Sequence, residues 1–484
     1  SFLTLSNNVG SIMNLRKTIA IGILIRLVLM PFFAHPYDVF AWYSFYLDAS
    51  NDISSLVLNF PHLWKITLFP FFLLYSFLSE LTGLEAFSTE ILPSILQPQW
   101  GIEFVPGVLF NFVSKIPIFF SDLVLALVFR KILINSTGDK DLADKATALL
   151  YLNPLLIWIS AGRGMWDSIP TLFSIISLYF MTTRRIAFSA IALAISVLYK
   201  LYTIIFIIPI ILFLYRRSNQ NVKKNSVLKF ILIFGATILL DVIPYLSTIP
   251  TMVTGLVTPT PFFGLPGFGL TYWSISALVP ELSQFLELGV YIMMIFMFGL
   301  TLHHVNRLSF DKPILNLSIG MLGFLLAFFL SFNFIAEHFL IWALPFIIIA
   351  TVEKKVEKGL LWFTTITALI YAHKNFPYYL LPTYIWFGSQ LEFLARIVQP
   401  LQNITIVKGN AILMPSISGG LIMTFLGILC SILFLIIYLE LFYLQKAGSM
   451  LRLRVMFFRS IESLKKLLQI QLRHDKSPFN KPSD

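Results

Sequence analysis

The chain has 484 residues, of which 57% are hydrophobic and only 12% are charged, and its mean hydropathy is +0.82. A soluble domain carries charge on about a quarter of its residues, so this composition excludes one. The net charge of +11 would indicate a nucleic-acid partner in a soluble protein. Here the basic residues cluster in short segments between apolar runs, which the positive-inside rule explains without nucleic acid.

The first apolar run, Ile19 to Phe33, follows Arg16-Lys17 and is not followed by a small-residue cleavage site. It therefore predicts a retained first transmembrane helix rather than a cleaved signal. A long external loop is expected next, from Ala34 to about Pro106. Within it, His62–Phe77 is apolar but carries Lys65 and Pro70. Counting it as a crossing would invert every later loop, so we predict an interfacial or re-entrant helix.

The later apolar segments come in pairs between basic clusters, as expected when every cluster is cytoplasmic. The pairs are Ala146–Ser160 with Ser168–Met181, Ile186–Tyr199 with Tyr202–Leu214, Val227–Leu246 with Leu286–Leu302, Leu315–Phe332 with Phe339–Thr351, and Leu360–Tyr371 with Leu421–Leu444. We predict an all-α polytopic membrane protein with about 12 transmembrane helices, a long first external loop containing interfacial helices, and both termini cytoplasmic. The expected units are a tail (1–15), a transmembrane domain (16–445) and a basic cytoplasmic tail (446–484).

Asp38 follows the first helix directly, in the segment His35-Pro36-Tyr37-Asp38. Pro36 is expected to end that helix and to leave Asp38 at the outer boundary of the membrane, near Tyr37 and Trp42 of the interfacial aromatic belt. A carboxylate there could accept a proton from an incoming hydroxyl. An ordinary solvated aspartate is an equally open interpretation. For Asp48 and Asp52, further along the loop, turn or cap chemistry is favoured.

Two further polar groups are expected on the same side. In Gly162-Arg163-Gly164-Met165-Trp166-Asp167-Ser168, the flanking glycines predict an exposed Arg163 that could hold a phosphate, and Asp167 or Ser168 could cap the following helix. Lys200 stands in an apolar hairpin, where it either extends to the interface or binds a lipid phosphate.

The last group is Glu337-His338, at the outer start of a later helix. These side chains could position a sugar or phosphate, although an interfacial histidine with satisfied hydrogen bonds is the commoner case. The sequence has no HExxH motif and no cysteine pair, so no metal site is predicted. Gly264–Gly269 lacks the strand and the Lys-Ser/Thr of a nucleotide loop and is expected to be an irregular external loop. Asn403-Ile404-Thr405 is an external glycosylation sequon.

These motifs, in this order, resemble the GT-C superfamily of integral membrane glycosyltransferases over about Ile19 to Thr351. The resemblance is carried by Asp38 after the first helix, by Leu152-Asn153-Pro154 with Gly164 to Pro170, by Lys200 before an Ile-Pro-rich helix, and by Glu337-His338-Phe339 through Leu344-Pro345. Two departures stand out. Tyr37 occupies the first position of the family's acidic pair, and Met165 replaces a glutamine. They leave Asp48 and Asp52 open as alternative bases.

The resemblance implies an inverting transfer of one hexose, with mannose favoured, from a polyprenyl or dolichyl monophosphate carrier to a lipid-linked glycan. Asp38 would be the base, Arg163 and Lys200 would bind the donor phosphate, and Asp167, Glu337, His338, Tyr37 and Trp42 would shape the substrate site. The resemblance requires no metal cofactor, although some members of the superfamily use a divalent ion. The expected location is a prokaryotic plasma membrane or the endoplasmic reticulum membrane, with an external or luminal site.

A transporter or lipid flippase is the alternative. A transporter places its charged residues near the middle of the bilayer, between related halves of the chain. The candidates here cluster at predicted outer helix ends, which favours chemistry at one interface. The sequence does not determine the oligomeric state.

Overall fold

The computed structural model describes residues 15–52, 62–83, 87–88, 105–217, 220–243, 269–277, 281, 283–308, 311–373, 379–387, 393, 396 and 417–443. The described residues are almost entirely helical, which confirms the predicted all-α class; two-residue strands β1 (Phe87–Ser88) and β2 (Val105–Pro106) pair antiparallel. The helices are α2 (Leu15–Phe32), α3 (Pro36–Asn51), α5 (His62–Thr82), α7 (Val108–Ser114), α8 (Ile116–Thr137), α9 (Lys140–Tyr151), α10 (Pro154–Ile157), η1 (Trp158–Arg163), α11 (Ser168–Thr182), α12 (Ile186–Tyr199), η2 (Leu201–Phe206), α13 (Ile207–Arg217), α14 (Gln220–Val242), η4 (Tyr272–Ala277), α16 (Ser283–Val305), α17 (Pro313–Ser331), η6 (Glu337–Phe339), α18 (Leu340–Val352), α19 (Lys358–Ala372), α21 (Leu381–Phe387) and α23 (Ile417–Phe442).

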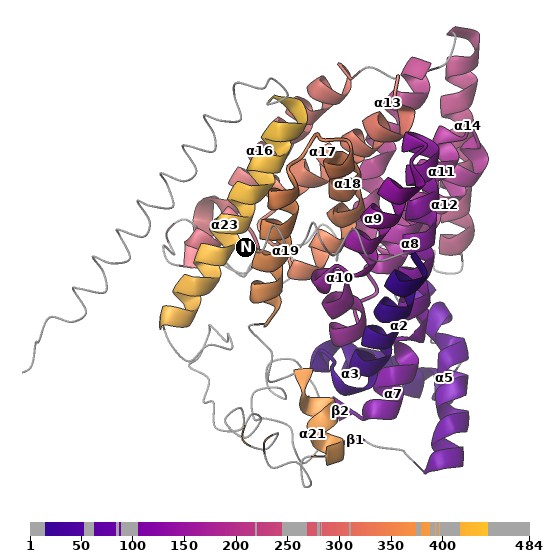
Figure 1. The fold of residues 1–484 in the computed structure, drawn as a ribbon, viewed down its shortest axis with the longest axis vertical. Coiled ribbons are helices and arrows are strands. Elements are labelled where there is room, and N and C mark those ends of the chain that lie inside the picture. The colour runs from indigo at the N-terminus through magenta and orange to yellow at the C-terminus, as the bar shows by residue number, and fades with distance from the viewer. Residues whose placement is uncertain are drawn as a thin grey trace, which may run out of the picture.

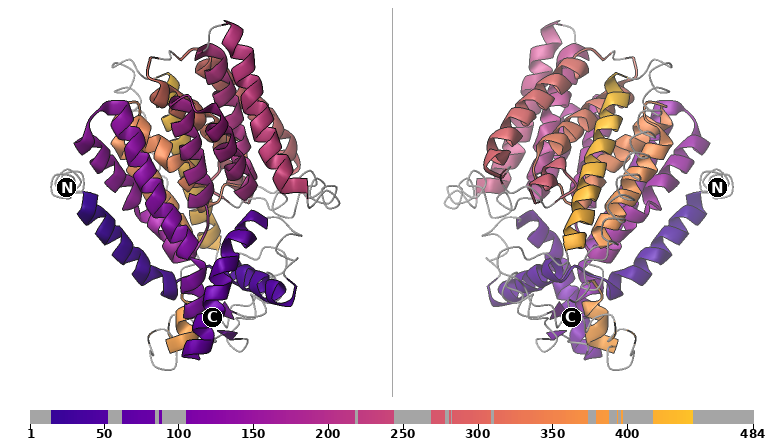
Figure 2. Two further views of the ribbon diagram at one scale, coloured as in Figure 1. Left: turned by 90° about the vertical axis from the view of Figure 1, so that its right-hand side faces the viewer. Right: turned by 90° about the vertical axis from the view of Figure 1, so that its left-hand side faces the viewer.

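The helices form a bundle with a smaller layer at one end (Figure 1). The layer contains α3, α5, α7 and α21, and Figure 2 shows indigo α2 running along one side of the molecule toward it. The buried apolar side chains follow the same division. One large cluster fills the bundle, and a second, rich in aromatic residues, joins α3, α5 and α7 around Trp42, Trp64 and Phe110. The layer and the bundle meet where α2 ends and α3 begins.

Proline and asparagine produce two breaks that matter for the site. Helix α2 ends at Phe32, and Pro36 opens α3 at 77° to it. Pro36 has no N–H and a φ already suited to a helix, so it starts a helix better than it continues one. At the second break, α9 and the α10–η1 segment meet at 44°. The Asn153 side chain accepts from the N–H groups of Leu155 and Leu156 and so caps α10.

Four of the described helices are long and apolar enough to cross a membrane, or up to six if each bent pair is one span. The prediction of about 12 crossings is therefore not confirmed, although helices occur at the predicted positions. Several of those helices, such as α11, α12 and α19, are apolar but have only 10–17 residues. A span of about 20 residues is needed for a bilayer core. The hydropathy of the sequence therefore located these apolar helices but did not give their lengths.

Helix α5 is one continuous helix from His62 to Thr82 despite Pro70. It packs against α3 and α7 at the end of the molecule and not within the bundle (Figure 1). It is not among the helices that are long and apolar enough to span. Its predicted interfacial or re-entrant placement remains a prediction.

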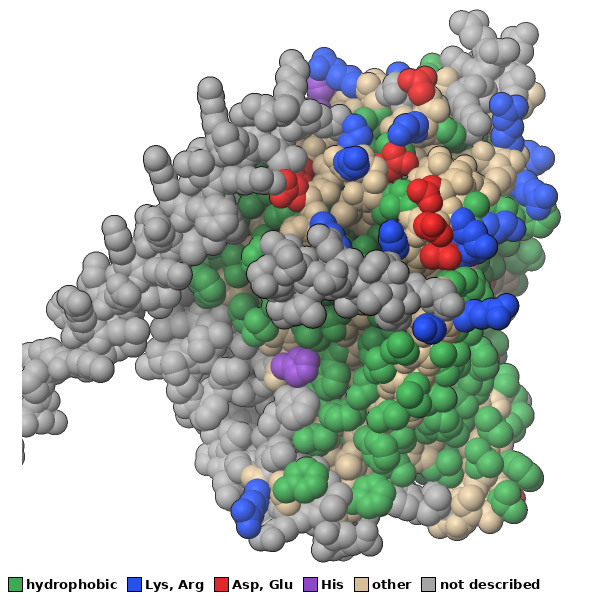
Figure 3. Space-filling model, in the orientation of Figure 1, with side chains coloured by type: hydrophobic (Ala, Val, Ile, Leu, Met, Phe, Trp, Pro, Cys, Tyr) green, Lys and Arg blue, Asp and Glu red, His purple; other side chains and the backbone are tan. Residues whose placement is uncertain are grey.

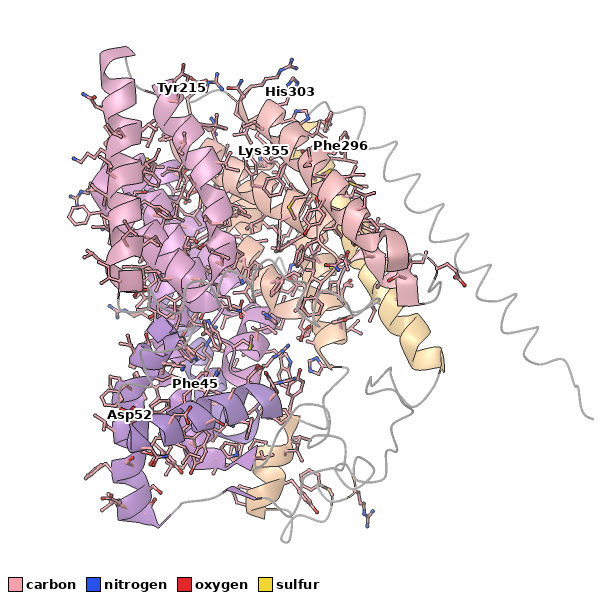
Figure 4. All side chains as sticks on the ribbon, turned by 180° about the vertical axis from the view of Figure 1, so that it is seen from behind. Phe45, Asp52, Tyr215, Phe296, His303 and Lys355 are labelled. Carbon is pink, nitrogen blue, oxygen red and sulfur yellow. The ribbon has the colours of Figure 1, made fainter. Side chains whose placement is uncertain are left out.

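Charged side chains lie mainly at the end opposite the small layer. In Figure 3, Lys, Arg, Asp and Glu gather over the upper half of this face, above a band of hydrophobic side chains. Figure 4 places His303 and Lys355 at that end, and Phe45 of α3 and Asp52, which follows α3, at the other. The structure thus places the predicted cytoplasmic clusters at His303 and Lys355 at the opposite end of the bundle from Phe45 and Asp52 of the predicted outer loop. Which end faces the cytoplasm remains a prediction.

Some sequence-based predictions concern residues outside the described part. They are the tail before Leu15, the loop residues 264–268, the sequon at Asn403 and the basic tail 446–484.

Candidate functional site

Asp38, Arg163 and Glu337 form one chain of ion pairs across three segments. Arg163 Nε lies 3.4 Å from Asp38 Oδ2, and Arg163 Nη1 donates to Glu337 Oε1. His35 Nδ1 is 3.3 Å from the same Asp38 oxygen. The contacts with Arg163 and His35 both involve Asp38 Oδ2, and the other carboxylate oxygen, Oδ1, takes part in neither contact. The guanidinium is 11% exposed, and the flanking glycines therefore do not leave it solvent-exposed as the sequence predicts.

Asp167 and Lys200 form a second pair beside the first. Lys200 Nζ lies 2.7 Å from Asp167 Oδ1, which also accepts from the indole N–H of Trp342. The predicted capping role of Asp167 is wrong: it precedes α11, but its side chain makes no cap hydrogen bond. Lys200 Nζ also lies 5.2 Å from the centre of the Trp166 ring. Its side chain is 16% exposed, so the protein encloses most of it beside Asp167.

Burial leaves several polar atoms of this region without a hydrogen-bond partner among the described residues. They are Asp167 Oδ2, Ser168 Oγ and His338 Nδ1. Asp167 is fully buried, and burial raises the pKa of its carboxyl while the nearby Lys200 ammonium lowers it. The site thus holds three carboxyl groups, those of Asp38, Asp167 and Glu337, beside the basic groups of Arg163 and Lys200. These atoms can accept or donate further hydrogen bonds to a polar group that enters.

The local backbone explains why these side chains converge. Segment Trp158–Arg163 is a π-helical turn that ends at Gly164, whose φ is +89°. A single π turn inserted in a helix is a frequent feature of functional sites. The backbone N–H of His35 donates to the Arg163 carbonyl at 3.1 Å. The start of α3 and the end of this turn are therefore bonded directly, which brings Asp38 to Arg163.

Asp38 is in the first turn of α3, not in a loop after α2. Asp48 and Asp52, the alternative bases, are exposed at the other end of α3. Ten helical residues separate Asp38 from Asp48, a rise of about 15 Å. The structure does not bring either alternative to the ion pairs.

The aromatic residues expected near the substrate separate into two environments. Tyr37 is 40% exposed, whereas Trp42 is 1% exposed. Trp42 packs edge-on against Trp64, with ring centroids 5.3 Å apart, and Trp64 stacks on Trp166 at 5.1 Å. Trp42 therefore supports the Trp166 ring beside Lys200 and lies within the aromatic core of the layer.

Sequence reasoning missed three residues of the site. Trp342 holds Asp167, and Tyr379, which is fully buried, packs on the His35 ring at a centroid distance of 5.6 Å. Lys115 is fully buried beside the π-helical turn. A lone lysine in the apolar run after Pro106 was the available signal, since an ionisable residue at membrane depth is costly. Among the described residues, no group of three or more His, Cys, Asp or Glu side chains could hold a metal ion.

Comparison with known proteins yields two partial matches. The family model described as GPI transamidase subunit PIG-U matches residues 103–263. GPI mannosyltransferase 1 of Saccharomyces cerevisiae is 30% identical over 114 residues, which are 23% of this chain and 28% of that relative. The chain thus matches less than a third of the curated relative's length. Both matches are partial and show what these segments of the chain are similar to.

Proposed function

We propose that this GT-C-like membrane protein is an inverting hexosyltransferase. It would move one hexose, with mannose favoured, from a polyprenyl or dolichyl monophosphate to a lipid-linked glycan. The observation that carries the proposal is the buried ion-pair chain of Asp38, Arg163 and Glu337 beside the Asp167–Lys200 pair. It gathers one candidate base and two candidate phosphate ligands from segments far apart in the sequence.

The chemistry assigns one step to each group. Asp38 accepts the proton of the acceptor hydroxyl as the hydroxyl oxygen forms a bond to the anomeric carbon. The bond from that carbon to the phosphate oxygen breaks, and the carrier phosphate leaves with both bonding electrons. Attack opposite the leaving group inverts the anomeric centre.

Arg163 and Lys200 stabilise the leaving phosphate in this proposal. A guanidinium has five N–H donors and an ammonium has three. Each cation can therefore bind phosphate oxygens while it keeps a carboxylate partner, Glu337 for Arg163 and Asp167 for Lys200. Hydrogen bonds between charged groups are the strong ones, and preorganised cations need little rearrangement when charge develops.

The test is transfer of radiolabelled hexose from the dolichyl-phosphate carrier by purified protein in lipid vesicles. Asp38→Asn should lower the rate by roughly 10²–10⁴-fold, the usual contribution of a general base. Asp48→Asn, on the exposed end of the same helix, should leave it unchanged. Loss with Asp48→Asn and not with Asp38→Asn would move the base to Asp48.

The match to GPI transamidase subunit PIG-U favours a second candidate, a subunit that binds a lipid-linked glycan without transferring sugar. The matched residues 103–263 include Arg163, Asp167 and Lys200 but neither Asp38 nor Glu337. In that case wild-type protein would transfer no hexose from any carrier and would co-purify with other transamidase subunits.

A further inference from the structure

Lys115 lies between α7 and α8 and is 0% exposed. Its Nζ lies within hydrogen-bond distance of four carbonyl oxygens, those of Met30 at 3.1 Å, Ala161 at 3.0 Å, Gly162 at 3.1 Å and Phe33, which share its three N–H donors. The salt bridges of the described residues do not include it. A lysine is almost never fully buried unless it is paired, and here its partners are backbone carbonyls.

These carbonyls belong to the end of α2 and to the end of the π-helical turn, the two segments that lead to Asp38 and Arg163. Met30 and Phe33 are at the end of α2, just before His35 and Asp38. Ala161 and Gly162 are in the π-helical turn that ends at Arg163. Terminal carbonyls of a helix have no partner within the helix and carry partial negative charge. One buried ammonium thus satisfies both ends at once.

Neighbouring residues complete the arrangement. Asn111 Nδ2 donates to Pro31 O at 2.8 Å and to Phe33 O at 3.0 Å, which holds the same end of α2. A Cβ on Gly164 would lie only 2.7 Å from Lys115 Cε, so the lysine stem fills the space under that glycine. The ammonium position and the Arg163 backbone are therefore fixed together.

We propose that Lys115 is a positioning residue that sets the distance between Asp38 and Arg163 without contacting substrate. The proposal rests on the transferase function proposed above. Without Lys115, the carbonyls of Met30, Ala161 and Gly162 would lose this donor in a dry site, where unsatisfied polar groups are costly. The Phe33 carbonyl would keep its hydrogen bond from Asn111. The two segments would then separate or rotate, and a displacement of about 1 Å can cost 10²-fold in rate.

The first test is a double-substitution cycle on kcat/KM for hexose transfer. Lys115→Met should lower it by about 10²-fold. In an Arg163→Lys background, which keeps the charge but loses the planar fork, Lys115→Met should add much less, because coupled residues are non-additive. Losses that simply multiply would overturn the proposal. Lys115→Gln, which keeps two N–H donors, should fall between wild type and Met, and it enters the cycle if the Met variant does not fold.

Lys65→Met is the matched control. Lys65 is 4% exposed on α5, and its Nζ lies 4.6 Å from the centre of the Phe45 ring. It is a buried lysine on another helix of the same layer, outside the end of α2 and the π-helical turn, so its replacement should leave transfer unchanged. A loss equal to that of Lys115→Met would indicate a general effect of removing a buried cation and would overturn the specific role.

Hydrogen exchange of the intact protein separates this proposal from the transferase proposal. The amides of Trp158–Gly164 should exchange faster in Lys115→Met and not in Lys65→Met. Unchanged exchange in folded Lys115→Met overturns the role of Lys115 even if wild type transfers hexose. Conversely, absence of transfer by wild type rejects the enzyme while the exchange data still decide whether Lys115 fixes the turn.

Discussion

At the scale of single residues, the site is a set of charges that compensate each other inside the protein. Asp167 is fully buried and depends on Lys200 and on the Trp342 indole for compensation. Removing one partner of a buried pair costs about 3–5 kcal/mol, whereas removing both can be nearly neutral. The pairing thus has a consequence for stability that is separate from any role in phosphate binding.

Lys200→Met should lower the melting temperature of the purified protein and weaken donor binding, because the Asp167 carboxylate is then buried without its cation. The double variant Lys200→Met/Asp167→Asn should recover most of the stability but not the donor affinity. Thermal unfolding with and without the dolichyl-phosphate donor measures both effects. A double variant less stable than Lys200→Met would contradict the pairing.

The same variant has an expected pH dependence. Burial raises the pKa of the Asp167 carboxyl, and the charge of Lys200 lowers it. Loss of Lys200 should therefore raise the pKa of Asp167 further. A group with a raised pKa contributes more stability when protonated, so Lys200→Met should regain stability as pH falls. Lys312→Met, which removes the exposed cation of the pair with Glu353, is the control. It should cost at most about 1 kcal/mol.

At the scale of elements, the site depends on how helices end. Two glycines end such segments with similar left-handed backbones: Gly138 after α8 at φ +69°, and Gly164 after the π-helical turn at φ +89°. Their surroundings differ. A Cβ on Gly138 would meet nothing within 4 Å, whereas one on Gly164 would meet Lys115 at 2.7 Å and Trp42 at 3.3 Å. Comparing alanine variants of these two glycines therefore distinguishes backbone strain, which both would have, from side-chain crowding, which only Gly164 would have.

Gly138→Ala should destabilise the protein only by the left-handed strain, about 1–2 kcal/mol. Gly164→Ala should cost more and should also reduce hexose transfer, because the new methyl group displaces Lys115 or the turn that carries Arg163. Melting temperatures and transfer rates of the two variants test this. Equal effects of both variants on stability and transfer would exclude crowding at Gly164 as a determinant of the site.

At the scale of the molecule, the small layer that contains α3 lies at the end of the bundle opposite to His303 and Lys355 (Figure 4). Asp52 after α3 and His303 near the end of α16 are both exposed and mark the two ends. The positive-inside rule assigns the His303 end to the cytoplasm. The separation in space does not depend on that assignment.

Cysteines placed at Asp52 and at His303 should react with a membrane-impermeant thiol reagent from opposite faces of sealed vesicles. The natural Cys430 is fully buried and should contribute little background. Labelling of Asp52→Cys from the cytoplasmic face and of His303→Cys from the other would invert the orientation. Labelling of both from one face would rule out a bundle that spans the membrane.

The sequence by itself determined the helical class, the approximate helix positions and the polar residues worth attention. Apolar run length and basic clusters are local properties that a single chain displays directly. It did not determine the number of crossings, because a helix such as α11 is apolar without being long enough to span by itself. The sequence also predicted Asp38 in a loop after the first helix, whereas Pro36 begins a new helix with Asp38 in its first turn.

Only the tertiary structure decided which of these residues meet. Arg163 and Glu337 are 174 positions apart, and nothing in either local sequence specifies their contact. Asp167 looks like a helix cap in sequence, yet the fold turns its carboxylate to Lys200 and Trp342. Lys115 is an isolated lysine in the sequence, and only the fold brings the end of α2 and the π-helical turn around it to supply four carbonyls. Local patterns set the elements, whereas partners for buried charge arise only when distant segments pack together.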